Sequence, residues 1–160
     1  RALAERLALP HVELDALLRR SHALTLHVPA NKATHHLLSA HEFEQMKEGA
    51  VLINTSRGSV VDTAELLRAL TEGAVSAAGL DVLAEEPTIR EEAELLRSIY
   101  RKEHDLETLF ADHMLMHLRN VFVTPHTAFN TKEAVEAIVR TTMDNIRAFA
   151  EGEPRNIVNQ

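Results

Sequence analysis

Short apolar, β-prone runs alternate in this chain with stretches whose apolar residues recur at helical spacing. Three of these runs, 50–53, 77–80 and 121–123, pass directly into short polar motifs. Strands that alternate with helices predict an α/β fold built on a parallel sheet. The carboxyl ends of parallel strands lie at one edge of the sheet, where ligands bind in open α/β folds. We therefore expect the polar motifs to gather at that edge.

Composition and charge exclude several functions. The chain has 160 residues, of which 45% are hydrophobic and 26% are charged, as in ordinary globular proteins. A net charge of −7 and dispersed Lys and Arg residues predict no nucleic-acid partner. No apolar run approaches the length of a membrane span, so we expect no membrane partner. The absence of cysteine rules out disulfides and thiolate metal sites and fits a reducing, cytoplasmic location.

Capping and turn residues place the helices. Ser39-x-x-Glu42 is a capping box, and Gly49 is positioned to end the helix that it opens. Similar signals start helices at Asp62 and Asn130. The predicted helices cover 12–19, 39–49, 62–73 and 130–152, and two further helical pieces are expected within 88–118. The predicted strands are 23–28, 51–53, 77–80 and 121–124.

A dinucleotide-binding fold requires a glycine-rich turn between its first strand and helix. No pair of the five glycines has the required spacing. The chain also starts within a helix-like stretch, 1–9, and lacks an initiator Met. We therefore interpret the sequence as a fragment whose amino-terminal part is missing.

Arg57 and His126 are the residues best suited to chemistry. An arginine after a strand is commonly a surface residue or an ion-pair partner, but small hydroxyl residues precede Arg57 and Gly58 allows a sharp turn. A guanidinium held in this way suits bidentate capture of a carboxylate. His126 follows Pro125 after an apolar strand, and a carboxylate such as Glu86 could orient one ring nitrogen while the other meets a substrate.

Together these motifs resemble the NAD-dependent D-2-hydroxyacid dehydrogenase family. The resemblance extends from about residue 12 to residue 158, and several motifs in the same order carry it. The most specific pieces are His27-Val28-Pro29, residues 46–58 ending in Asn54-Thr55-Ser56-Arg57-Gly58, Gly79-Leu80-Asp81-Val82 with Glu86-Pro87, and Thr124-Pro125-His126.

The resemblance implies a fold and a set of catalytic residues. It implies a partial doubly wound, Rossmann-like parallel sheet: residues 1–129 would be the carboxy-terminal half of a nucleotide-binding domain, and 130–160 a helix and tail returning towards a largely absent catalytic domain. By motif, Arg57 would bind the substrate carboxylate and oxygen, and His126 would be the general acid/base. Glu86 would orient His126, because the family's glutamate directly precedes the proline; Glu85 is the neighbouring alternative.

The cofactor implied by the resemblance is NAD. Its contacts would come from loops that follow three of the strands. Thr34 could instead be an ordinary exposed loop residue, and Asp81 a strand-end cap. The cofactor-binding residues expected by motif are Val28, Pro29, Thr34, Thr55, Ser56, Arg57 and Asp81.

The reaction implied is reversible hydride transfer between NAD(H) and a small 2-hydroxy or 2-oxo acid. Residues 128–131 look most like the D-lactate type, with Phe129 near the substrate side chain, while Asn130 departs from the aromatic residue often found there. D-lactate and pyruvate are therefore the expected pair, and a homodimer is expected for the full-length form. Two alternatives are open: an NAD(H)-sensing transcriptional corepressor of the same fold, and an inert fragment.

A metal site is not expected. His113 and His117 stand four residues apart on a predicted helix, a spacing that can present two ligands on one face. No third ligand is evident, and zinc sites normally use at least three protein ligands. A packed helix face with Met114 and Leu118 is the favoured interpretation.

Overall fold

The computed structural model describes residues 10–84 and 106–157. The chain divides into two compact units, Arg1–Pro125 and His126–Gln160, which are described separately below. The first predicted helical piece of 88–118 lies mostly outside the described residues, as do Glu85 and Glu86.

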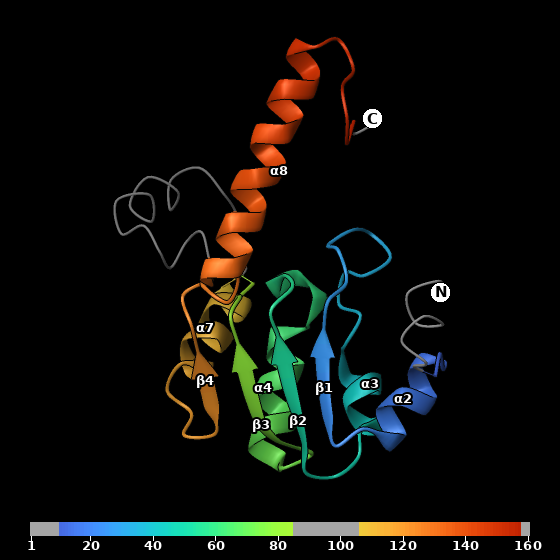
Figure 1. The fold of residues 1–160 in the computed structure, drawn as a ribbon. Coiled ribbons are helices and arrows are strands. Elements are labelled where there is room, and N and C mark those ends of the chain that lie inside the picture. Colours follow the sequence, from blue (N-terminus) through green and yellow to red (C-terminus); the bar gives the residue numbers. More distant parts are fainter. Residues whose placement is uncertain (1–9, 85–105, 158–160) are drawn as a thin grey trace. The chain divides into compact units, whose positions relative to one another are not determined.

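The first unit is built on a four-stranded parallel sheet in the order β1-β2-β3-β4 (Figure 1). Each strand lies next to its neighbour in sequence. This arrangement confirms the predicted α/β fold with a parallel sheet. The strands are β1 (Ala23–Leu26), β2 (Ala50–Asn54), β3 (Val75–Leu80) and β4 (Val121–Val123).

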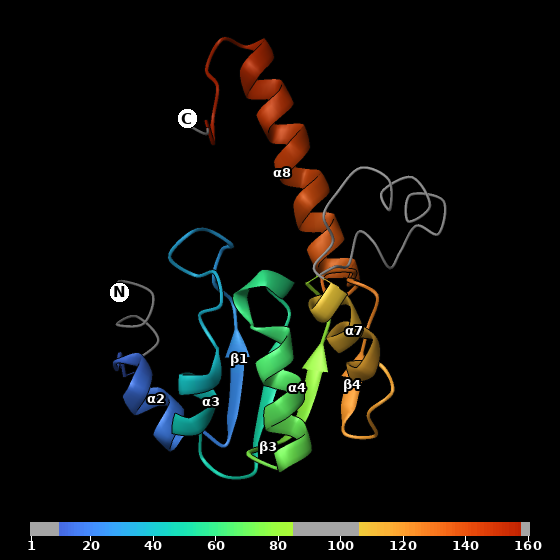
Figure 2. The same cartoon turned by 180° about the vertical axis from the view of Figure 1, so that it is seen from behind.

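Helices supply the crossovers. The described helices of this unit are α2 (Leu14–Arg20), α3 (Ala40–Gln45), α4 (Thr63–Glu72) and α7 (Leu106–Leu115), and a 3-10 turn, η1, covers Gly58–Val60. Figures 1 and 2 show α3, α4 and α7 on the same face of the sheet. Helix α2 packs beside α3, and α4 lies between α3 and α7.

Side-chain alternation along the strands decides which residues form the core. Leu24, Leu52 and Leu80 point to the helices and are buried, together with Leu66 from α4 and Phe43 from α3. Residues at the alternate positions are more accessible. Ile53 is 38% exposed and Phe122 is 72% exposed, so within the described residues of this unit the other face of the sheet has no helix over it.

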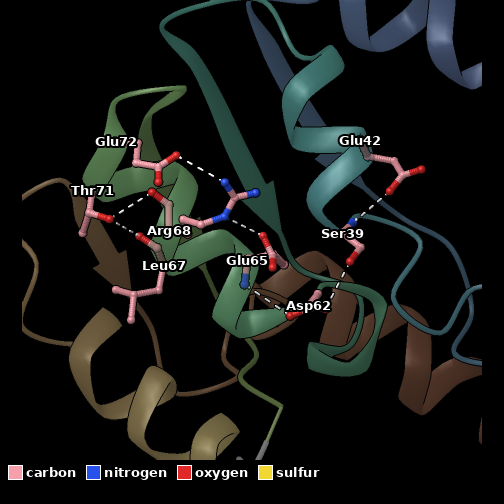
Figure 3. A network of polar contacts seen from close by, with 8 residues as sticks. All are labelled: Ser39, Glu42, Asp62, Glu65, Leu67, Arg68, Thr71 and Glu72. Atoms are coloured by element: carbon pink, nitrogen blue, oxygen red, sulfur yellow. Dashed lines mark hydrogen bonds and ion pairs between the residues drawn. The ribbon is translucent and has the colours of Figure 1, made fainter.

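Asp62 joins the amino-terminal ends of α3 and α4 (Figure 3). Its Oδ1 accepts a hydrogen bond of 3.2 Å from the Glu65 amide and so caps α4, as predicted. Its Oδ2 accepts a bond of 3.1 Å from the Ser39 hydroxyl. The Ser39 amide in turn donates to Glu42 Oε2 at 3.0 Å, which is the backbone half of the predicted capping box.

The exposed side of α4 carries a small ion-pair network (Figure 3). Arg68 Nε lies 2.8 Å from Glu65 Oε2, and Arg68 Nη1 lies 3.4 Å from Glu72 Oε2. The hydrogen bond and charge of Glu65, with a smaller contribution from Glu72, raise the pKa of the Arg68 guanidinium above its ordinary value. Because the guanidinium is protonated at neutral pH in any case and the pair is exposed, this network adds little stability.

Some predicted details are wrong. Helix α3 ends at Gln45 rather than at Gly49, and Gly49 takes a left-handed φ of 74° in the turn where the Ala50 amide donates to the Lys47 carbonyl. In the second helical piece expected within 88–118, the spacing of Leu106, Leu109 and Phe110 predicts a buried stripe. The buried residues of α7 are instead Ala111, Asp112 and Leu115, and Phe110 is 63% exposed.

The second unit consists mainly of helix α8 (Lys132–Ala150). Its cap is Thr131, whose Oγ1 accepts a bond of 3.2 Å from the Ala134 amide, and not the predicted Asn130. The helix gives way to a turn in which Gly152 has a left-handed φ of 79°, as its position predicts. Among the described residues of α8 only Ala148 is buried, and the large apolar residues at helical spacing are exposed: Val135, Ile138, Val139, Met143, Ile146 and Phe149. No helix among the described residues has both the length and the apolar character that a membrane crossing demands.

Candidate active site

The polar motifs of the first unit share one edge of the sheet. Arg57 follows β2, Asp81 directly follows β3, and Thr124 directly follows β4. All four strands are parallel, so their carboxyl ends meet at the same edge. This is the edge at which open α/β folds bind their ligands.

A buried amide holds the turn that carries Arg57. Asn54, the last residue of β2, is 1% exposed. Its Oδ1 accepts hydrogen bonds from the Ser56 amide at 3.0 Å and the Ser56 hydroxyl at 2.8 Å, and its Nδ2 donates to the Arg57 carbonyl at 3.0 Å. The chain between β2 and η1 is therefore a fixed turn.

The Arg57 side chain is exposed, and its Nη1 donates to the Ser56 carbonyl at 2.7 Å. No carboxylate among the described residues forms an ion pair with it. An accessible guanidinium on a fixed backbone can bind an anionic group in two-pronged geometry.

Asp81 is a buried carboxylate, 4% exposed, at the end of β3. Its amide donates to the Asn54 carbonyl at 2.9 Å, and its Oδ1 accepts a short hydrogen bond from the Thr124 hydroxyl. Asp81 thus links the loops after β2, β3 and β4. These contacts are those of the strand-end role considered from the sequence.

The loop after β1 supplies the other expected cofactor contacts. Val28 is half-buried and Pro29 is exposed. The Thr34 hydroxyl donates to the Pro29 carbonyl and accepts a bond of 3.0 Å from the Asn31 amide. In this structure Thr34 therefore closes its own loop. Thr55, in the neighbouring loop, is half-buried, and Ser56 is buried against Asn54.

His126 is the first residue of the second unit. It is partly exposed and has a left-handed φ of 53°, a conformation that few residues other than glycine adopt. Its ring meets Phe129 edge to face, with centroids 6.3 Å apart and planes at 84°. Such backbone conformations are frequent at functional sites.

Glu86 and its alternative Glu85 lie outside the described residues. Among residues 10–84 and 106–157, no group of three or more His, Asp or Glu side chains is arranged to hold a metal ion. His113 and His117 instead contact each other edge to face, with ring centroids 4.7 Å apart.

Sequence comparison decides the family. Residues 2–128 match the family model described as "D-isomer specific 2-hydroxyacid dehydrogenase, NAD binding domain". The chain belongs to this family. The cofactor of the domain is NAD.

Individual dehydrogenases show how the family varies. Over 98% of its length the chain is 40% identical to a glyoxylate reductase from Thermococcus litoralis, and over 92% it is 38% identical to a glycerate dehydrogenase from Methylorubrum extorquens. A solved D-lactate dehydrogenase from Aquifex aeolicus, complexed with NAD and lactic acid, superposes over 96% of the chain with a TM-score of 0.77 and 35% identity. The chain spans 41% of the first two proteins and 44% of the third.

The residues present at the sheet edge fit NAD. A dehydrogenase cofactor needs hydrogen-bond acceptors for the carboxamide of its nicotinamide ring and a position beside the substrate-binding groups. The buried Asp81 carboxylate is such an acceptor, and it shares its edge with Arg57. Within residues 10–84 and 106–157 the sequence contains no glycine-rich phosphate turn.

Sequence reasoning missed Asn54. By residue type alone, an asparagine after a strand is an ordinary turn residue. The available signal is the motif itself: Asn54 directly follows a predicted strand, a hydroxyl residue, Ser56, follows two positions later, and Arg57 follows three positions later.

Proposed function

We propose that the complete protein is an NAD-dependent dehydrogenase that interconverts a small 2-oxo acid and the corresponding D-2-hydroxy acid. The observation that carries this proposal is the Arg57 turn. Its guanidinium is accessible, its backbone is held by a buried amide, and it lies at the same sheet edge as Asp81. The family membership and the names of the related dehydrogenases support the same reaction.

The chain's own residues provide binding and proton transfer. Arg57 binds the substrate carboxylate and stabilises negative charge that develops on the reacting oxygen. His126 donates the proton in the reducing direction, and Glu86 orients its ring. When bound, NADH supplies the hydride.

The cofactor is held along the strand ends. Asp81 accepts hydrogen bonds from the carboxamide, and Thr55, Ser56 and Arg57 flank the nicotinamide ribose. In the loop after β1, Val28, Pro29 and Thr34 line the cofactor. The accessibility of Thr55 and the burial of Asp81 support this assignment.

The substrate pair we propose is pyruvate and D-lactate. Phe129 is 56% exposed and stacks edge to face on His126, so an apolar ring stands beside the proposed proton donor. A ring in this place suits a small methyl-bearing substrate better than a polar one. For the complete protein we further propose a homodimer, which light scattering of the purified protein would reveal.

The test is turnover by the complete gene product. NADH oxidation is followed with pyruvate, glyoxylate and hydroxypyruvate, and the configuration of the product is determined. We expect turnover with the highest kcat/KM for pyruvate and D-lactate as the product. A preference for glyoxylate would overturn the substrate assignment alone, whereas tight NADH binding without turnover of any 2-oxo acid would overturn the dehydrogenase and favour an NAD(H) sensor.

A further inference from the structure

We propose that Asn54 and Gly58 are positioning residues that lock the Arg57 turn against the loop after β3. The inference rests on the proposed function, in which Arg57 binds the substrate carboxylate. Asn54 acts at one end of the turn through hydrogen bonds. Gly58 acts at the other end through the absence of a side chain.

The Asn54 amide is committed to the turn. It is 1% exposed, and its side chain forms hydrogen bonds with Ser56 and with the Arg57 carbonyl. A buried carboxamide is costly unless both its donor and its acceptor are paired. The pairing therefore favours one turn geometry over others that would leave the amide unsatisfied.

The hydrogen bonds to the Arg57 carbonyl fix the backbone from which the Arg57 side chain extends. That carbonyl accepts from Asn54 Nδ2 at 3.0 Å and from the Val60 amide at 3.3 Å, the latter within η1. The orientation of the Arg57 peptide follows from these two donors. The exposed side chain beyond it has one described hydrogen bond, from Nη1 to the Ser56 carbonyl.

Asn54 also reaches the loop after β3. Its backbone carbonyl accepts from the Asp81 amide at 2.9 Å. One residue is thus bonded to the arginine turn through its side chain and to the proposed carboxamide acceptor through its backbone. The two loops cannot shift relative to each other at this point without breaking one of these bonds.

Gly58 fixes the opposite end by close approach. A Cβ built on Gly58 would lie 2.2 Å from the Leu83 carbonyl carbon and oxygen and 2.4 Å from the Ala84 nitrogen. These are backbone atoms, which cannot swing aside as the end of a flexible side chain can. Any larger residue at this position would push the Arg57 turn away from the loop after β3.

Such a displacement would affect substrate binding before it affected the cofactor. A shift of about 1 Å at a substrate-positioning group can cost about 10²-fold in rate. We therefore expect variants at either position to raise KM for the 2-oxo acid and to lower kcat/KM by about 10- to 10²-fold. NADH affinity should fall by a smaller factor than kcat/KM does, because the acceptor Asp81 is retained even though Thr55, Ser56 and Arg57 belong to the displaced turn.

The sharpest test compares Asn54→Asp with Asn54→Leu in the complete gene product. An aspartate keeps the acceptor for Ser56, but when ionised it cannot donate to the Arg57 carbonyl; when protonated it regains a donor. Burial favours the protonated carboxyl. The KM of Asn54→Asp relative to the parent should therefore fall as the pH is lowered, while that of Asn54→Leu should stay high throughout.

Asn120→Asp is the matched control. Asn120 Nδ2 donates to the Ser76 carbonyl at 3.0 Å, and Asn120 directly precedes β4 at the opposite edge of the sheet. The substitution removes the same kind of amide-to-carbonyl bond away from the turn. We expect Asn120→Asp to leave KM unchanged at every pH, and Gly58→Ala to raise KM without any pH-dependent rescue.

Amide hydrogen exchange in the same proteins gives a readout that does not depend on turnover. Faster exchange at Val60 and Val61, whose amides bond to Arg57 and Gly58, is expected in Asn54→Leu and Gly58→Ala but not in Asn120→Asp. If the parent protein turns over no 2-oxo acid, the proposed function fails. Hydrogen exchange alone then tests whether Asn54 and Gly58 hold the Arg57 turn in place. Unchanged exchange in both variants, or a KM equal to that of the parent in an active enzyme, would overturn the inference.

Discussion

At the level of single residues, Arg57 combines an accessible side chain with a constrained backbone. Replacing Arg57 with alanine removes the fork that binds a carboxylate, so we expect kcat/KM for pyruvate to fall about 10²- to 10³-fold, with a higher KM. Arg57→Lys should recover only part of this loss, because an ammonium cannot bind in two-pronged geometry. Steady-state kinetics of the complete gene product measure the effect. Arg68→Ala, on the exposed side of α4, is the control, and normal pyruvate saturation of Arg57→Ala would contradict carboxylate binding there.

His126 is the second residue whose proposed role can be tested directly. Replacement with glutamine keeps a hydrogen-bonding side chain of similar size but removes the transferable proton, so turnover should fall about 10²-fold or more. NADH binding, measured by fluorescence titration, should be unchanged. His117→Gln is the control, since His117 lies just after α7 and contacts His113 of that helix. A turnover close to that of the parent would reject His126 as the general acid.

The chemical types of these side chains could be predicted from the sequence, but the residues that hold them in position could not. Arg57 and Asp81 stand in motifs after apolar runs, and their side chains are those that the proposed reaction requires. The role of Asn54 could not be predicted, because its side chain bonds to the amide and hydroxyl of Ser56 and to the carbonyl of Arg57. Nothing in residue type reveals which backbone atoms a buried amide will meet, because burial is a property of the packed chain.

At the level of elements, Asp62 connects two helices that are separate in sequence (Figure 3). It caps α4 and accepts the Ser39 hydroxyl at the start of α3. Asp62→Ala removes both bonds, so we expect a loss of about 1–2 kcal/mol in the free energy of unfolding, measured by denaturant titration. Ser39→Ala should cost less, because the Glu65 amide keeps its cap.

A double-mutant cycle separates the cap from the connection. If the two helices are coupled through this contact, Ser39→Ala and Asp62→Ala should be non-additive by about 0.5 kcal/mol or more. Thr131→Ala, which removes only a local cap of α8, should add to Ser39→Ala without coupling. Strict additivity of the first pair would show that the Ser39–Asp62 bond contributes nothing to stability.

Local capping rules succeeded where one residue satisfied them and failed where two did. The helix starts at Ser39 and Asp62 are as predicted, since each is followed three residues later by a glutamate. At α8, both Asn130 and Thr131 are good caps, and the structure uses Thr131. Gly49 was misassigned because a left-handed glycine serves a strand-entry turn as well as a helix end.

At the level of the whole chain, alternating strand and helix patterns were sufficient to predict the parallel sheet. They could not specify which face of the sheet the helices would cover, because every strand carries apolar residues on both faces. Ile53 and Phe122 look like core residues in the sequence, yet both are exposed. Periodicity reports that a residue is apolar, whereas its burial depends on what packs over it.

NADH binding by the 160-residue chain itself depends on how many of the cofactor's contacts these residues supply. The nicotinamide end of the cofactor has an acceptor in Asp81, but the described residues offer no glycine-rich turn to receive the pyrophosphate. Charge-assisted hydrogen bonds contribute about 1.5–3 kcal/mol each, so lacking even one weakens binding by about tenfold or more.

We therefore expect the 160-residue polypeptide to bind NADH at least about tenfold more weakly than the Aquifex aeolicus D-lactate dehydrogenase whose structure contains NAD. Fluorescence titration of both proteins in one buffer measures the difference. Asp81→Asn should abolish the remaining binding, because an amide that must also satisfy Thr124 is a poorer acceptor than a carboxylate. Equal affinity in the two proteins would mean that the sheet edge after β2 and β3 binds the cofactor without a glycine-rich turn for the pyrophosphate. Backbone amides at that edge would then have to bind the phosphates.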